Sequence, residues 1–347
     1  MTLSATGLAL LAAALFGAST PFVKLLVGDV SAPVLAGLLY LGSGLGLAAA
    51  RLARDRGWRP GGLAGAEWLW FAGAVAFGGV LGPLLLVVGL AHTPAGTASL
   101  LLNLEAVLTA LLAWIVFREH ADRRIVLGMA LIVAGGLALS WPAGDAGAGS
   151  LAGPLAIAGA CLCWAVDNNL TRKVSASDAL FIAGMKGLVA GSVNLGLALA
   201  LGHGLPAWTL AGAAMLVGLA GYGLSLVLFV HALRELGTAR TGAYFSTAPF
   251  VGAALALVLL HEPTPAPFWL AAVLMGIGVW LHLTERHGHT HMHDALAHTH
   301  AHVHDAHHRH EHDFPWDGHE PHTHPHAHAP LSHSHWHFPD IHHRHDH

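Results

Sequence analysis

The sequence predicts an all-α membrane protein with ten transmembrane helices in two inverted five-helix repeats, followed by a disordered histidine-rich tail. Three observations predict this fold class. Hydrophobic residues make up 54% of the chain and charged residues 10%, whereas a soluble domain usually carries about a quarter charged residues. Apolar runs long enough to cross a membrane recur up to Glu285. From His287 onward the chain changes class, because this segment holds 24 of the 30 histidines and almost no aliphatic runs.

The apolar runs define the helices and the division of the chain. A helix needs about 20 mostly apolar residues to cross the hydrocarbon core, and it satisfies its backbone polar groups internally. No Lys or Arg precedes the first run, so we expect an uncleaved span rather than a signal peptide. The predicted spans are 4–27, 32–50, 67–91, 95–117, 123–141, 151–171, 179–201, 209–233, 241–260 and 266–283. The predicted units are residues 1–145 and 146–285, with five spans each, and a cytoplasmic metal-binding tail at 286–347.

The basic residues of the loops predict the orientation. Alternate loops hold eleven of them and the other five loops hold none. Short loops rich in Lys and Arg stay in the cytoplasm, which predicts a multi-pass protein of the plasma membrane (the inner membrane of a bacterium) with both termini cytoplasmic. The eleven residues are Arg51, Arg54, Arg56, Arg59, Arg118, Arg123, Arg124, Arg172, Lys173, Arg234 and Arg240.

Two offsets match the first half of the chain to the second. An offset of 143 places Gly89–Glu119 on Ala232–Glu262, and an offset of 148 places Lys24 on Arg172. Five spans per half is an odd number, so the halves must have opposite orientations, which is an architecture of secondary transporters. The alternative is that helices rich in Ala, Gly and Leu resemble one another by composition alone.

Three segments carry a resemblance to a known family: Phe16–Lys24, Leu108–Glu119 and Pro249–Glu262. With the span layout, they resemble the drug/metabolite transporter superfamily in its ten-helix EamA-like branch, over about residues 4–283. The resemblance implies two EamA-like five-helix repeats and a secondary transporter, and it says little about the substrate. The chain departs from the family at Glu105, where an apolar residue or proline is usual.

Four ionisable residues lie within predicted spans: Lys24, Glu105, Asp167 and Lys186. Such residues are costly in a membrane and usually face a cavity or a partner. Two acids and two bases could form purely structural ion pairs. Glu105 lies closest to the middle of its span, beside Asn103, and a carboxyl group at this depth is suited to take up and release a proton.

Asp167, Asn168 and Asn169 are adjacent polar residues in the sixth span. Neighbours on a helix point about 100° apart, so at least one of the three should face a cavity or a neighbouring helix. The candidate substrate and coupling residues are Glu105, Asn103, Asp167, Asn168, Asn169, Lys186 and Lys24.

Several classes of protein are not indicated. The sequence contains no Walker loop, no paired-aspartate motif and no serine-nucleophile motif, so we expect neither an ATP-driven pump nor an enzyme, and no catalytic residues. The net charge of −4 gives no signature of nucleic-acid binding. Cys161 and Cys163 lie in one apolar run and imply no disulfide framework. The expected partners are the lipid bilayer and a small-molecule or metal-ion substrate, and a homodimer is left open.

The tail contains a duplicated unit. Residues 293–312 recur at 328–347 with eleven of twenty positions identical. Neutral imidazole suits zinc, nickel, cobalt and copper(II), so we expect the tail to bind a transition metal, although no cofactor is required by the membrane core. With few large apolar residues it should be disordered without metal. A pH sensor and spare low-complexity sequence are the alternatives. The candidate ligands are His293, His298, His300, His302, His304, His307, His308, His310, His312, His328, His333, His335, His337, His342, His343, His345 and His347.

These observations favour a secondary active transporter of small solutes, most consistent with an exporter, that works by alternating access and carries a metal-binding tail. A transition-metal efflux transporter for nickel, cobalt or zinc is the second hypothesis, in which the metal captured by the tail is the substrate. A membrane-anchored metal buffer or sensor is the third.

Overall fold

The helices of the protein fall on the predicted spans. The computed structural model describes residues 4–57, 61–117, 123–141, 151–174, 177–236, 238–284, 288–293, 296–302, 322–328 and 331–336. The largest difference in helix ends is at α2, which ends at residue 55 rather than 50. The helices are α1 (Ala5–Leu26), α2 (Ala32–Asp55), α3 (Glu67–Ala74), η1 (Val75–Leu81), α4 (Gly82–His92), α5 (Ala95–Leu101), α6 (Leu104–Phe117), α7 (Arg123–Ser140), α8 (Ala152–Arg172), α9 (Ala179–Ala200), α10 (Trp208–Gly218), η3 (Leu219–Leu224), α11 (Ser225–Leu236), α12 (Thr238–Phe245), α13 (Ala248–Leu260) and α14 (Ala266–Leu283).

Helix length and composition identify a membrane protein. Among the described residues, seven helical segments are long and apolar enough to cross a membrane, and two shorter apolar helices, Ala248–Leu260 and Ala266–His282, accompany them. Large apolar side chains lie on the outside of the bundle, such as Leu69, Ile115 and Val258, which are 77%, 73% and 68% exposed. A soluble monomer rarely exposes so extensive an apolar surface, so this surface is suited to lipid.

Local chemistry sets several helix ends. The Ser4 hydroxyl accepts a hydrogen bond from the Gly7 backbone N–H at the start of α1, and the Asp178 carboxylate accepts one from Leu180 at the start of α9. Both satisfy donors that a first helical turn leaves free. Proline lies in the first turn of α2, α4, α13 and α14, where its missing N–H costs nothing.

The two halves carry matching irregularities. The third helical segment contains a π-helical turn, η1, and the offset of 143 carries it to residues 218–224, where η3 spans Leu219–Leu224. The fourth segment breaks between α5 and α6 at Leu102 and Asn103, and the ninth breaks between α12 and α13 after Phe245. Composition alone does not place two rare π turns and two breaks at equivalent positions, so these features support a repeated unit of structure.

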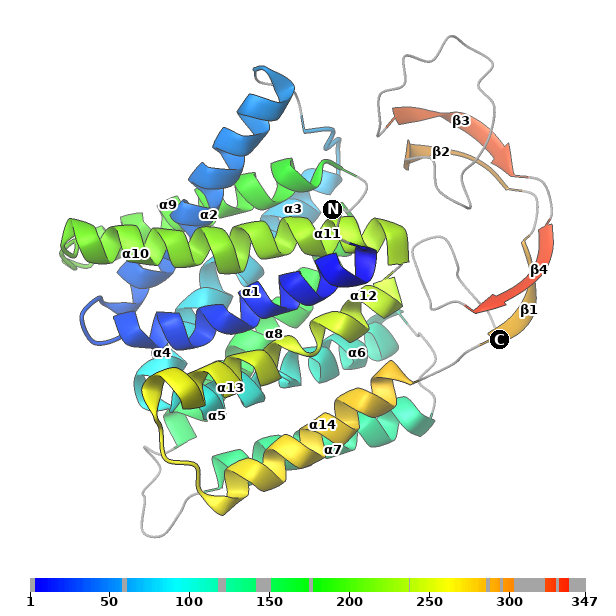
Figure 1. The fold of residues 1–347 in the computed structure, drawn as a ribbon. Coiled ribbons are helices and arrows are strands. Elements are labelled where there is room, and N and C mark those ends of the chain that lie inside the picture. The colour runs from blue at the N-terminus through cyan, green and yellow to red at the C-terminus, as the bar shows by residue number, and fades with distance from the viewer. Residues whose placement is uncertain are drawn as a thin grey trace.

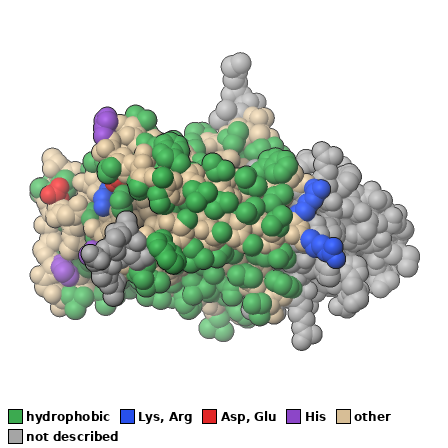
Figure 2. All heavy atoms as spheres, turned by 90° about the horizontal axis from the view of Figure 1, so that it is seen from below, with side chains coloured by type: hydrophobic (Ala, Val, Ile, Leu, Met, Phe, Trp, Pro, Cys, Tyr) green, Lys and Arg blue, Asp and Glu red, His purple; other side chains and the backbone are tan. Residues whose placement is uncertain are grey.

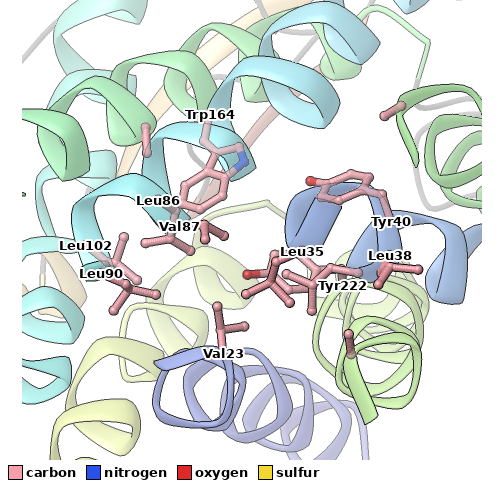
Figure 3. Packing of buried hydrophobic residues seen from close by; sticks show 14 of the residues in the cluster. Val23, Leu35, Leu38, Tyr40, Leu86, Val87, Leu90, Leu102, Trp164 and Tyr222 are labelled. Carbon is pink, nitrogen blue, oxygen red and sulfur yellow. The ribbon is translucent and has the colours of Figure 1, made fainter. Parts of the chain in front are cut away.

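Helix packing is reciprocal between the halves. Helix α1 packs on α11 and α13 of the second half, and α8 packs on α4 and α6 of the first. Helix α2 packs on α9, and α7 lies beside α14 (Figure 1). The main hydrophobic core includes side chains from α1, α2, α4, α8 and η3, and Figure 3 shows Tyr40, Trp164 and Tyr222 around it. A second cluster joins α5, α6, α7, α13 and α14.

Charged side chains gather towards the ends of the bundle. Hydrophobic side chains cover the middle of the face in Figure 2, and charged and histidine side chains lie towards its ends. Arg51 and Arg54 at the end of α2 form ion pairs with Asp178 and Asp55. Burial acts to raise the pKa of Asp178, but hydrogen bonds from Arg54, Arg51 and the Leu180 backbone outweigh it and hold that pKa below its ordinary value. This cluster ties α2 of the first half to α9 of the second.

The described residues of the tail differ from the predicted disorder. They form four strands, β1 (Gly288–His293), β2 (Leu296–His302), β3 (His322–His328) and β4 (Leu331–Trp336), beside the helical bundle (Figure 1). Strand β1 pairs antiparallel with β4, and β2 pairs antiparallel with β3. The physical reason is the two-residue period of His-x-His, which is the period of a β-strand, so a polar segment without a core can still form a paired ribbon.

Candidate functional site

Glu105 and Asn168 meet where the fourth helical segment is broken. Glu105 lies in the first turn of α6, directly after the break. Its Oε1 accepts a hydrogen bond from Asn168 Nδ2 of α8 at 2.9 Å, and the same amide lies 3.5 Å from the Thr109 hydroxyl. A carboxylate in a first helical turn is stabilised by the helix dipole. The broken helix of the first half therefore presents a partly buried carboxyl group to an exposed amide on α8 of the second half.

Asp167 and Lys186 form a buried ion pair beside this site. Lys186 Nζ of α9 donates to Asp167 Oδ2 of α8, and the two side chains are 10% and 9% exposed. The Thr171 hydroxyl donates to Asp167 Oδ1 at 2.9 Å. A Cβ at Gly78 would collide with the Asp167 carboxylate, so glycine at this position leaves the room that the pair occupies.

The other predicted site residues lie elsewhere. Asn169 donates to the Ala165 carbonyl of its own helix at 2.8 Å. Asn103 is buried and donates to the Leu100 carbonyl at 2.9 Å, which satisfies an acceptor at the break rather than facing Asn168. Lys24 does not pair with an acid in the site, because its Nζ donates to the carbonyls of Leu90 and Thr93. The sequence left open two structural ion pairs among the four ionisable residues. Asp167 and Lys186 form one such pair, whereas Lys24 and Glu105 have other partners.

The π turn η1 supplies carbonyl acceptors that neighbouring helices satisfy. Gly78 O accepts from the Tyr40 hydroxyl at 2.7 Å and from Trp164 Nε1 at 3.1 Å. Asn194 Nδ2 of α9 lies 3.3 Å from Gly79 O. A π turn interrupts the regular ladder of a helix and often occurs at functional sites. The sequence signal available for it is the pair Gly78 and Gly79, which the offset of 143 places on Gly221 and Tyr222.

Aromatic rings border the same region. Phe16 contacts Trp164, Tyr222 and Phe245, with ring centroids 6.2, 5.9 and 5.3 Å apart. Tyr40 lies 5.5 Å from Tyr222. These rings come from five different helical segments, and Figure 3 shows Tyr40 and Trp164 on one side of the cluster with Tyr222 between them and α1. The region between the halves thus combines a carboxyl group, an ion pair and aromatic surface.

One polar contact was not predicted. The Glu262 carboxylate, just after α13, accepts hydrogen bonds from the backbone N–H groups of Ala95 and Gly96 at the start of α5. The available signal was the offset that matches Glu262 to Glu119. The partner atoms could not be identified from it, because backbone donors leave no trace in a sequence.

The predicted metal ligands lie partly within the described strands. Their backbone register pairs His298 with His326, His300 with His324, and His335 with His289. The described side chains contain no group of three or more His, Cys, Asp or Glu residues arranged to hold a metal ion. The predicted ligands His304, His307, His308, His310, His312, His337, His342, His343, His345 and His347 lie outside the described residues.

Comparison with known proteins points to one family. The EamA-like transporter family matches residues 3–141 and again residues 151–284. An uncharacterized transporter of Methanothermobacter thermautotrophicus is 33% identical over 209 residues, which cover 58% of this chain and 60% of that protein. A probable 4-amino-4-deoxy-L-arabinose-phosphoundecaprenol flippase subunit ArnE of Pseudomonas fluorescens is 42% identical over 73 residues, or 21% of this chain and 61% of that protein. The chain thus matches about three-fifths of the length of each of these relatives.

A solved structure shares the fold. One crystal structure superposes on this chain with a TM-score of 0.58 and 20% sequence identity. The match covers 80% of this chain and 94% of the chain in that structure. The predicted resemblance to the drug/metabolite transporter superfamily is confirmed by the family match.

Proposed function

Because the chain belongs to the EamA-like transporter family, we propose that it is a secondary active transporter that exports small solutes by alternating access. The observation that carries this proposal is the contact of Glu105 with Asn168 at a helix break between the two halves. Secondary transporters bind substrate and coupling ion near the midplane, at helices interrupted in this way. The name of the relative in Pseudomonas fluorescens, a probable flippase subunit, also supports movement of a substrate across a membrane.

Ten crossings in two inverted repeats fit the observed helices. In this arrangement four pairs of consecutive helices each form one interrupted crossing: α3 with α4, α5 with α6, α10 with α11, and α12 with α13. The π turns, which overlap at an offset of 143, and the helix breaks, which match at 144, support two copies of one unit, and five crossings per copy require opposite orientations. Alternating access then consists of one half rocking against the other around a fixed central site.

Proton exchange at Glu105 is the proposed coupling step. Its carboxylate accepts a hydrogen bond from the Asn168 amide, which can donate to the charged form and, through its oxygen, accept from the protonated form. Asn168 is exposed in the structure, which supports access of water or substrate to this contact. We propose that substrate and proton compete for or share the Glu105 site. Phe16, Tyr40 and Tyr222 pack on one another in this structure, and we propose that their rings contact the body of the substrate when the halves move apart.

The topology is tested by reporter fusions. We expect an alkaline phosphatase reporter at Asp145 to be active outside the cytoplasm and a green fluorescent protein at the C-terminus to be fluorescent inside it. The reason is the location of all eleven loop bases on one predicted side. An inactive phosphatase at Asp145 would contradict both the ten-crossing arrangement and the cytoplasmic tail.

A second function, metal binding by the tail, is supported by the strand register. Residues directly opposite in an antiparallel pair have Cβ atoms about 4.5–5.5 Å apart and share a face of the ribbon. The register sets His298, His300 and His302 opposite His326, His324 and His322. We propose that a His-x-His unit and an opposing histidine together supply a metal ion with three imidazoles, the number that catalytic zinc sites such as carbonic anhydrase use.

Truncation after Glu285 tests the tail. We expect full-length protein to bind zinc or nickel at neutral pH and the truncated protein to bind none above background. Binding should weaken as the pH falls below about 6.5, because protonated imidazole cannot ligate a metal. Within the full chain, replacing His298, His300 and His302 with Ala should lower the bound metal, whereas Thr299→Ala, between them, should not. Metal content would be measured on purified protein after dialysis.

The same variants separate the alternatives. If truncation leaves solute transport intact and removes only metal binding, the leading proposal stands. If it reduces metal efflux from cells at low metal concentration, the metal ion is the substrate. If neither metal binding nor metal efflux changes, both metal functions are excluded, including the membrane-anchored buffer or sensor.

A further inference from the structure

The turn between α4 and α5 is held from two sides. Lys24 Nζ, near the end of α1, donates to the carbonyl oxygens of Leu90 at 2.5 Å and Thr93 at 2.9 Å. The Glu262 carboxylate accepts from the backbone N–H groups of Ala95 at 2.9 Å and Gly96 at 3.0 Å. Four hydrogen bonds from two charged side chains thus fix a turn of only a few residues. We name Lys24, Glu262 and this turn the outer clamp.

The charges of the outer clamp match the helix ends that they contact. Lys24 lies at the C-terminus of α4, where carbonyl groups are left without donors, and Glu262 lies at the N-terminus of α5, where N–H groups are left without acceptors. A cation at a helix C-terminus and an anion at an N-terminus are both favoured by the helix dipole. The contacts are partly buried, and each involves a charged partner, which makes them stronger than neutral hydrogen bonds.

The outer clamp crosses the boundary between the halves. Lys24 and the turn belong to the first half, and Glu262 follows α13 in the second. Helix α5 leads from the clamped turn to the break before Glu105, so the clamp and the proposed coupling site are the two ends of one short helix. The clamp lies at the end of the bundle whose loops hold no Lys or Arg, which is the predicted outer end.

We propose that the outer clamp is the gate on the outer side, closed in this structure, and that it must release the α4–α5 turn each time the central site opens outward. This inference rests on the proposed transport function. The contact between Glu262 and the α5 backbone joins the halves directly, so the second half cannot move away from α5 without breaking it. Asn168 is exposed in the same structure, as a central site that opens to the cytoplasm while the clamp is closed requires.

Distances between spin labels test the gate without a known substrate. Labels would be placed at Ala91→Cys, at the end of α4, and Ala266→Cys, at the start of α14, both of which are exposed positions on opposite halves. Cys161 and Cys163 are buried and would be replaced by Ala. The full chain in lipid nanodiscs should give one short distance at pH 7. Glu262→Gln removes the charge and leaves a single acceptor oxygen, so the ratio of open to closed outer ends should rise about tenfold or more.

Glu67→Gln is the matched control. Glu67 also accepts a backbone N–H, that of Ala64, but within one segment of the first half. We expect it to leave the distance distribution unchanged. An unchanged distribution in Glu262→Gln, or the same widening in Glu67→Gln, overturns the gate. If Glu262→Gln does not fold, Lys24→Met decides by the same criterion, since it releases the other side of the turn. A distribution that widens as expected without any transport by the protein would instead contradict the proposed function and leave the gate in place.

Discussion

Glu105→Gln should reduce gradient-driven transport to the rate measured without a gradient. Glutamine keeps the shape of the side chain and can still accept a hydrogen bond from Asn168, so folding should be preserved. It cannot take up and release a proton, so the remaining transport should no longer depend on an imposed pH gradient. The measurement is efflux from cells and from proteoliposomes, with protein amount and thermal stability checked for each variant.

Two adjacent asparagines provide the control for this prediction. Asn168→Ala removes the hydrogen bond to Glu105, whereas Asn169→Ala removes only a bond to the Ala165 carbonyl of the same helix. We expect Asn168→Ala to change the pH dependence of transport and Asn169→Ala to leave it unchanged. Transport by Glu105→Gln at the wild-type rate and with the wild-type pH dependence would exclude Glu105 as the coupling residue.

The second large effect concerns the buried ion pair. Asp167→Asn or Lys186→Met alone should reduce the free energy of unfolding by about 3–5 kcal/mol, because each leaves one charge buried without its partner. The double variant should recover much of that loss, since neither charge then remains. Unfolding in detergent, followed by helical circular dichroism, would give the three free energies of a double-mutant cycle.

Arg54→Ala is the reference for an exposed ion pair. Its side chain is 48% exposed and pairs with Asp55 and Asp178, so its loss should cost about 0–1 kcal/mol. If the Asp167 and Lys186 variants cost no more than Arg54→Ala, the pair is not desolvated and has no structural role of the kind inferred here.

The helices were predictable because lipid imposes a simple rule on composition. A run of about 20 apolar residues must be helical in a membrane, and the observed helices lie on these runs. The π turns were not predictable in this way. A π turn holds about one more residue than an α-helical turn, but this does not change the hydropathy of the sequence. Residues of η1 and η3 therefore look like ordinary parts of long apolar segments.

The site was predictable in its residue types but not in its contacts. The run Asp167, Asn168 and Asn169 required different directions for adjacent side chains, and the structure directs them to Lys186, Glu105 and the Ala165 carbonyl. Which residue takes which direction depends on the rotation of α8 against α6 and α9, which no local pattern encodes. In the tail, the alternation of histidine with other residues predicted metal ligands. The same alternation has the two-residue period of a β-strand, and these segments form strands in the structure.

The most direct test of the account is solute movement by purified protein under a controlled gradient. Candidate solutes would first be identified as compounds that accumulate in cells lacking the protein and return to normal with the wild-type chain but not with Glu105→Gln. Proteoliposomes would then be loaded with each solute and given a pH gradient. The account predicts gradient-dependent movement by the wild-type protein and by the chain truncated after Glu285, and its loss in Glu105→Gln. Movement that is equal in the wild-type protein and Glu105→Gln, or that persists at the same rate after the gradient is collapsed, would contradict it.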